Sequence, residues 1–148
     1  MIMKKKGMKI VTIILLLFFC TTSLASASDF SIQASPYLDR YYANIYNEGN
    51  GNMSIWFEVQ ATGKMDEIGG LSIRLQQRAN SSSTWKTIKT YSHVNYSSML
   101  ANDKAFYTSS VDYSGIYGYS YRAYVTIWAG KDGDGDSREI LTETIVAK

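Results

Sequence analysis

Residues Gly118–Gly130, with the sequence GYSYRAYVTIWAG, decide the fold class. Two sets of side chains alternate along this stretch, as they do in a strand with one face in a hydrophobic core. The sets are Tyr119, Tyr121, Ala123, Val125, Ile127 and Ala129 on one side, and Ser120, Arg122, Tyr124, Thr126 and Trp128 on the other. Because strand-favouring residues fill the stretch and glycines bound it, we predict a central strand against which shorter strands pair.

Six further stretches have strand-like composition and are separated by turn residues. Met53–Thr62 alternates most cleanly, with Ile55 and Phe57 among its inward residues, whereas the buried face of Arg40–Tyr46 stays ambiguous. The other four are Leu71–Gln76, Trp85–Tyr91 with Trp85 as a core anchor, Lys104–Tyr113 and Glu139–Val146. No window has the apolar spacing of a helix. Residues 37–148 are therefore predicted to form a single all-β domain, an antiparallel immunoglobulin-like or fibronectin-like sandwich of about seven strands.

Three segments between these strands are predicted to lack regular structure. The Asn- and Gly-rich run 47–52 is expected to form a hairpin loop, because its residues tolerate positive φ. Residues 63–70, GKMDEIGG, are expected to break one strand from the next. Residues 92–103 are expected to form a loop with Met99 and Leu100 against the edge of the sandwich.

The N-terminus has the pattern of a secretory signal peptide over residues 1–27. Four lysines precede the eleven-residue apolar run Ile10–Cys20, which is about half the length that a membrane-spanning helix needs. The small residues Ala25 and Ala27 predict cleavage before Ser28, with cleavage after Ala25 as the second choice. We therefore expect a secreted, extracellular chain without a membrane anchor, in which residues 28–36 form a polar lead-in.

Removal of the signal changes both the charge and the cysteine content. Four of the fifteen Lys and Arg residues fall within it, which leaves eleven against thirteen Asp and Glu, a formal net charge of −2. Without a basic excess, nucleic acid and anionic membrane surfaces are poor partners. The only cysteine, Cys20, also lies in the signal, so the exported domain has no disulfide and depends on its core.

Two resemblances add to this interpretation. Trp85 and the stretch Tyr119–Val125 resemble fibronectin type III and related immunoglobulin-like domains, which implies that Tyr119 or Tyr121 bonds its hydroxyl to backbone at a corner. Most of the chain also resembles small secreted Gram-positive proteins grouped as a domain of uncharacterised function. That second resemblance implies secretion and a shared β fold. It is carried by the blocks 65–69, 71–75, 83–87 and 128–131.

Outward-facing aromatic residues are the leading candidate for a ligand-binding surface. Trp56, Tyr124 and Trp128 fall on the outward sides of their strands, with Tyr42 or Tyr46 alongside. Exposed aromatic rings stack on sugars or meet protein partners, whereas a covering loop would make the same residues structural. The leading function is therefore a non-catalytic binding or structural module that recognises cell-wall polysaccharide, another extracellular polymer or an extracellular protein.

A calcium-stabilised secreted module is the second interpretation. Asp132, Asp134, Asp136 and Glu143 match the carboxylate spacing of a calcium loop. Ser137 stands where that motif has glycine, and strand rather than helix follows, so a solvated hairpin turn is the competing explanation. No other cofactor is expected.

The third interpretation, a small hydrolase, has little support in the sequence. Glu58 with Asp66 or Glu67 could form the two facing carboxyls of glycoside hydrolysis, which lie about 5 to 10 Å apart. His93, the only histidine, lies in a polar loop without a nucleophile motif, and zinc would need more nitrogen or sulfur ligands. We expect the protein not to be an enzyme.

Overall fold

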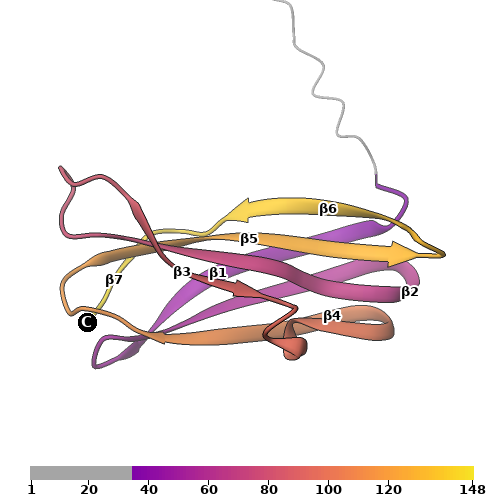
Figure 1. Ribbon diagram of the computed structural model, residues 1–148, viewed down its shortest axis with the longest axis horizontal. Coiled ribbons are helices and arrows are strands. Elements are labelled where there is room, and N and C mark those ends of the chain that lie inside the picture. Colours follow the sequence, from indigo (N-terminus) through magenta and orange to yellow (C-terminus); the bar gives the residue numbers. More distant parts are fainter. Residues whose placement is uncertain (1–34) are drawn as a thin grey trace, which may run out of the picture. The chain divides into compact units, whose positions relative to one another are not determined.

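The computed structural model describes residues 35–148 (Figure 1). The expected signal peptide, residues 1–27, and the lead-in up to residue 34 lie outside the described residues. Within the described part, no helix is both long enough and apolar enough to cross a membrane.

The described residues form an antiparallel all-β structure, as predicted. Their only helical element is a single 3₁₀ turn, η1, at Ser97–Met99. The seven strands are β1 (Leu38–Gly49), β2 (Asn52–Arg78), β3 (Lys86–Ser92), β4 (Leu100–Ser114), β5 (Ser120–Lys131), β6 (Asp134–Leu141) and β7 (Ile145–Val146). All seven belong to one sheet, which curls into a half-barrel (Figure 1).

The strand around which the sheet is built is β2, which is 27 residues long. Its first part pairs with β1 on one side and β4 on the other, and its second part pairs with β5 and β3. We refer to these parts with their neighbours as the first half and the second half of the sheet. The predicted central strand, β5, pairs with β2, β6 and β7, so it is an interior strand, but β2 has more neighbours.

The predicted break at residues 63–70 is wrong, because this segment continues β2. Met65 and Ile68 are buried, and residues 65–69 pair with the beginning of β4 while 67–70 pair with the end of β5. The irregularity that the sequence signals consists of two register shifts, one against β4 between Gln60 and Met65 and one against β5 between Gly70 and Ser72. Pairing on both sides keeps the backbone extended despite its glycines and charged residues.

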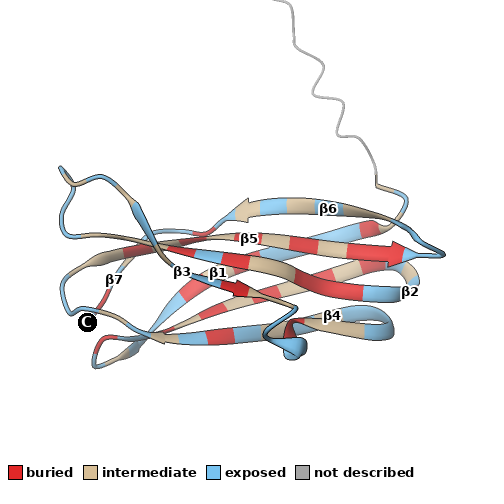
Figure 2. Cartoon of the chain, in the orientation of Figure 1, coloured by how far each residue is buried: buried red, intermediate tan, exposed pale blue. Residues whose placement is uncertain are grey.

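The inner faces of the two halves pack against each other and form the core. Phe57 in the first half lies against Gly70 in the second, and the rings of Tyr113 and Tyr121 are 6.1 Å apart. Figure 2 shows buried positions alternating with others along β2 and β5, as the sequence pattern predicted. The largest fully buried side chains are Tyr121, Phe57, Ile45, Met53, Ile55, Ile68, Ile73, Leu75, Met99, Ile127, Val59 and Val125.

The structure also resolves the ambiguous first strand. Ala43 and Ile45 are buried, so Tyr42 and Tyr46 point outward. The loop after β1 forms where expected, with positive φ at Gly49, Asn50 and Gly51. Burial of Met99 against the core is confirmed as well.

Two predicted anchors have different outcomes. Tyr121 is fully buried, and its hydroxyl accepts a hydrogen bond from the Ile116 backbone N–H (2.7 Å) and donates one to Gln77 Oε1 (2.8 Å). Tyr121 rather than Tyr119 therefore makes the expected bond to backbone. Trp85, predicted as a core anchor, is instead only half-buried, and two arginine side chains contact its ring.

Candidate functional site

The outer surface of the first half carries aromatic residues in successive cross-strand rows. Directly opposed residues of antiparallel strands share one face of the sheet, so β1, β2 and β4 each contribute one residue to a row. Rows follow one another at roughly 7 Å, and four of them extend about 20 Å. From one end the rows are Arg40–Gln60–Phe106, Tyr42–Glu58–Thr108, Asn44–Trp56–Ser110 and Tyr46–Ser54–Asp112.

Each of these rows holds one aromatic side chain, and we call Tyr42, Tyr46, Trp56 and Phe106 the aromatic face. Tyr42 is 49% exposed, Phe106 48% and Tyr46 43%, whereas Trp56 is half-buried. The Tyr42 and Trp56 rings lie 5.9 Å apart at an angle of 57°. Asn44 Nδ2 donates a hydrogen bond to the Tyr42 hydroxyl (3.1 Å), which helps to hold this pair in place.

Hydroxyl and amide groups surround the rings of the aromatic face. Partial desolvation, together with the neighbouring Tyr42 hydroxyl, raises the pKa of Tyr46. Glu58 lies beside Tyr42 within its row, with Thr108 beyond it, and Asn44 and Ser110 flank Trp56. The surface therefore combines ring faces with hydrogen-bonding groups.

The other two predicted aromatic residues do not join Trp56. Tyr124 and Trp128 lie on the outer surface of the second half, where Tyr124 is paired with Arg74 and Leu141. Arg74 and Arg122 place their guanidinium carbons 5.0 Å and 5.7 Å from the centre of the Tyr124 ring. Alternation along each strand correctly predicted an outward direction, but it carries no information about which half of a curled sheet a residue belongs to.

Trp128 has a structural contact of its own. A Cβ atom built on Gly130 would lie 2.6 Å from the Trp128 ring, and one built on Gly135 would overlap it. The indole therefore packs closely over the backbone of the β5–β6 hairpin, which only glycine permits at these two positions. This contact supports the structural alternative for Trp128, in which the ring is covered rather than free.

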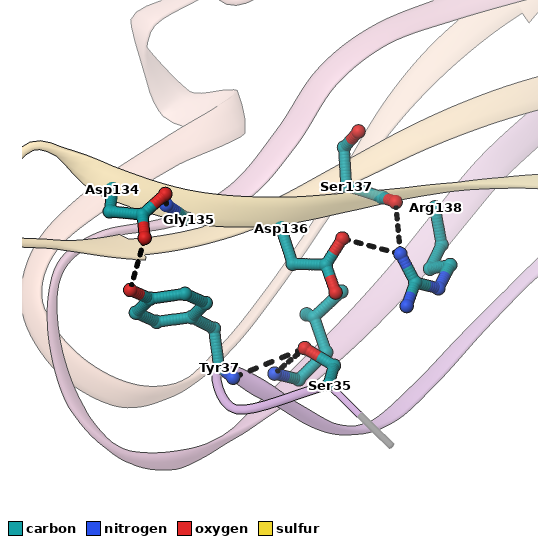
Figure 3. Close-up of polar contacts among 8 residues, drawn as sticks. Ser35, Tyr37, Asp134, Gly135, Asp136, Ser137 and Arg138 are labelled. Atoms are coloured by element: carbon teal, nitrogen blue, oxygen red, sulfur yellow. Dashed lines mark hydrogen bonds and ion pairs between the residues drawn. The ribbon is translucent and has the colours of Figure 1, made fainter. Parts of the chain in front are cut away.

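The carboxylates of the calcium interpretation have separate partners (Figure 3). Tyr37 donates a hydrogen bond from its hydroxyl to Asp134 (2.9 Å), and Arg138 pairs with Asp136 and holds the pKa of that carboxyl below its usual value. Asp132 is exposed, and its backbone N–H donates to Asp66. The bond between Tyr37 and Asp134 connects the residue before β1 to β6, and the backbones of β1 and β6 do not pair with each other in the described sheet.

Glu143 lies beyond the far end of β6. Because β6 is extended from Asp134 to Leu141, Glu143 is more than about 20 Å from Asp134. The structure therefore does not gather all four predicted ligands. Among residues 35–148, no group of three or more His, Cys, Asp or Glu side chains is arranged to hold a metal ion.

Calcium binding can be tested by thermal unfolding of chelated protein before and after addition of millimolar calcium. Binding would have to compete with Tyr37 for Asp134 and with Arg138 for Asp136. If calcium binds at this concentration, the melting temperature should rise, because a ligand that binds only the folded state stabilises that state. An unchanged melting temperature would reject the calcium interpretation, and magnesium serves as the matched control ion.

The residues of the hydrolase interpretation are also separated. Glu58 and Glu67 pair with Thr108 and Asn102, which are six positions apart on β4 and so separated by roughly 20 Å of strand, whereas a glycosidase pair lies within about 10 Å. Asp66 accepts a hydrogen bond from the Asp132 backbone, and His93 Nδ1 lies 3.1 Å from the Leu71 carbonyl oxygen. None of these contacts places a base beside a nucleophile.

Sequence reasoning missed two shallow hollows near the end of β4. Their volumes are about 410 and 440 Å³, and both are lined by Asp112, Tyr113 and Ser114. In the first hollow, the Tyr91 hydroxyl donates a hydrogen bond to the Asp112 backbone carbonyl, and burial raises the pKa of Tyr91 to about 12. The first hollow brings β3 and β4 together, and the second lies beside the paired ends of β2 and β4. No local pattern in the sequence signals either juxtaposition.

Comparison of the chain with protein-family models, with curated proteins and with solved structures gave no match. The resemblance to small secreted Gram-positive proteins stays a prediction.

Proposed function

We propose that this protein is an exported, non-catalytic module that binds a glycan chain of the cell wall through its aromatic face. The observation that carries the proposal is the contact between exposed Tyr42 and half-buried Trp56, set in a row pattern that also holds Tyr46 and Phe106. Exposed aromatic groups on one continuous surface are a feature of interaction sites.

A glycan matches the chemistry of this surface. Sugar rings present apolar faces that stack on aromatic side chains, and their hydroxyl groups need donors and acceptors of the kind that Asn44, Glu58 and Ser110 supply. The face is open and about 20 Å long, which suits an extended chain better than a small molecule that needs an enclosing pocket.

The proposal includes export and an immunoglobulin-like arrangement of the strands. Export is supported by the lysine-rich start, the apolar run Ile10–Cys20 and the small residues before Ser28. The hydrogen bond between the buried Tyr121 hydroxyl and the Ile116 backbone supports the immunoglobulin-like arrangement, because such domains carry a tyrosine that bonds backbone a few residues upstream.

The test is cosedimentation of the purified domain with cell walls, after the walls have been stripped of protein. We expect Trp56→Ala and Tyr42→Ala each to weaken binding about tenfold or more, because loss of a central aromatic contact costs on the order of 1–2 kcal/mol. Tyr117→Ala is the matched control, since Tyr117 is 75% exposed but lies in the turn after β4. Circular dichroism checks that each variant is folded.

Two results would contradict the glycan assignment. Wild-type protein that stays in solution with stripped walls would reject it, and so would equal binding by Trp56→Ala and wild type. Binding only to walls that retain their proteins would indicate a protein partner instead.

A further inference from the structure

The outer surface of the second half carries a stack of arginine and aromatic side chains. Arg78 Cζ lies 4.5 Å and Arg122 Cζ 4.3 Å from the centre of the Trp85 ring, one from β2 and one from β5. On its other side Arg122 approaches Tyr124, which Arg74 also contacts. We call Arg74, Arg78, Trp85, Arg122 and Tyr124 the arginine stack.

The charges of the arginine stack are only partly neutralised. Arg74 forms an ion pair with Glu139 at 2.6 Å. Arg78 and Arg122 form no ion pair with any residue in the described part of the chain. Two positive charges therefore lie side by side on a surface of a domain whose predicted exported form has a net charge of −2.

The terminal nitrogens of these two guanidinium groups have few partners. Arg122 uses Nε to donate a hydrogen bond to Gln76 Oε1 (3.0 Å), and its terminal nitrogens bond to no other described residue. Arg78 makes one long hydrogen bond, 3.4 Å, from Nη1 to the Ser81 carbonyl oxygen. Because both groups contact the Trp85 ring, less side-chain freedom remains to be lost when a ligand binds.

The geometry also restricts the ligand. The two guanidinium carbons are at most about 9 Å apart, since both lie close to the same ring centre. Both guanidinium groups contact the Trp85 ring, and most of their terminal N–H groups remain for an anion. A small anion can pair with one of the two groups, whereas a ligand with repeated negative charges can pair with both.

We propose that the arginine stack binds a phosphodiester polymer without bases, such as a polyol phosphate. Phosphate presents oxygens in several directions, which suits two guanidinium groups that contact the same ring. Nucleic acid is disfavoured because both arginines already contact the Trp85 ring on which a base would have to stack. The site is separate from the aromatic face and goes beyond the proposed glycan binding.

The experiment measures binding of the full exported domain to poly(glycerol phosphate) by isothermal titration calorimetry at low and moderate salt. We expect binding that weakens as salt screens the charges. The double variant Arg78→Gln/Arg122→Gln should bind at least tenfold more weakly. Lys104→Gln/Lys131→Gln is the matched control, because it removes the same charge from two exposed residues outside the stack. A melting temperature for each variant verifies folding.

A second double variant tests the stacked geometry itself. Arg78→Lys/Arg122→Lys keeps the charge but loses the planar fork, so it should bind more weakly than wild type despite an unchanged net charge. If the glutamine variant does not fold, this conservative variant and the two single glutamine variants carry the test. Trp56→Ala should bind poly(glycerol phosphate) as wild type does, which separates this inference from the proposed glycan site.

Three results would overturn the inference. The wild-type domain could fail to bind poly(glycerol phosphate), or the Lys104→Gln/Lys131→Gln control could lose as much affinity as the Arg78→Gln/Arg122→Gln variant. The Arg78→Lys/Arg122→Lys variant could also bind as tightly as wild type. Polyglutamate or single-stranded DNA bound as tightly as poly(glycerol phosphate) would overturn the assignment to a phosphodiester without bases.

Discussion

Replacing Phe57 with alanine is expected to lower the free energy of unfolding by about 3–5 kcal/mol. Phe57 is fully buried, and its ring fills the space over Gly70 at the point where the two halves of the sheet meet. Loss of the ring removes apolar contact and leaves a cavity that a continuous strand such as β2 cannot readily close. Equilibrium urea unfolding followed by circular dichroism measures the change.

Phe106→Ala is the matched control for this prediction. Phe106 is 48% exposed on the outer surface, so the same substitution should change stability by less than about 0.5 kcal/mol. Equal effects at both positions would contradict the assignment of inner and outer faces on which the core and the aromatic face depend.

Replacing Gly69 with alanine is expected to destabilise the fold by about 2–6 kcal/mol, through backbone strain and steric overlap together. Gly69 has φ of 145°, and a Cβ atom there would overlap the Met99 carbonyl oxygen and lie 3.1 Å from the Tyr107 ring. The strand cannot shift away easily, because Gly69 pairs with Leu100 of β4 and with Trp128 of β5.

Gly63→Ala provides the comparison within the same strand. A Cβ atom on Gly63 meets nothing within 4 Å, and its φ is not positive. We expect a neutral effect or a gain of about 0.4–1 kcal/mol from the lower entropy of the unfolded chain. Equal stability of the two alanine variants in thermal unfolding would contradict the close approach of Met99 in η1 to Gly69 in β2.

Local alternation predicted most of this fold because one face of each strand is buried. The inward sets of Met53–Ala61 and Tyr121–Ala129 are the buried sets in the structure. The prediction failed where pairing overrides local preference: Gly69 and Gly70 look like a turn but lie inside β2, with strands on both sides. Glycine at these positions makes room for Phe57 and Met99, a requirement that arises only from tertiary packing.

The candidate sites were less predictable than the strands. Trp56, Tyr124 and Trp128 share an outward direction, yet they differ in surroundings: Trp56 adjoins an exposed tyrosine, Tyr124 lies between arginines and Trp128 covers glycines. These differences depend on which strand pairs beside each residue. Neither the order of the strands nor the curl of the sheet is encoded in the spacing of a single segment.

The length of β2 has a mechanical consequence. Trp56 and Arg78 stand on one uninterrupted extended segment, and the backbone between them is hydrogen-bonded to neighbours along most of its course. Force applied by a polymer held at either end would be carried by covalent bonds and a shared hydrogen-bond ladder, not by a flexible hinge. β2 therefore links the aromatic face to the arginine stack through a single strand without a hinge.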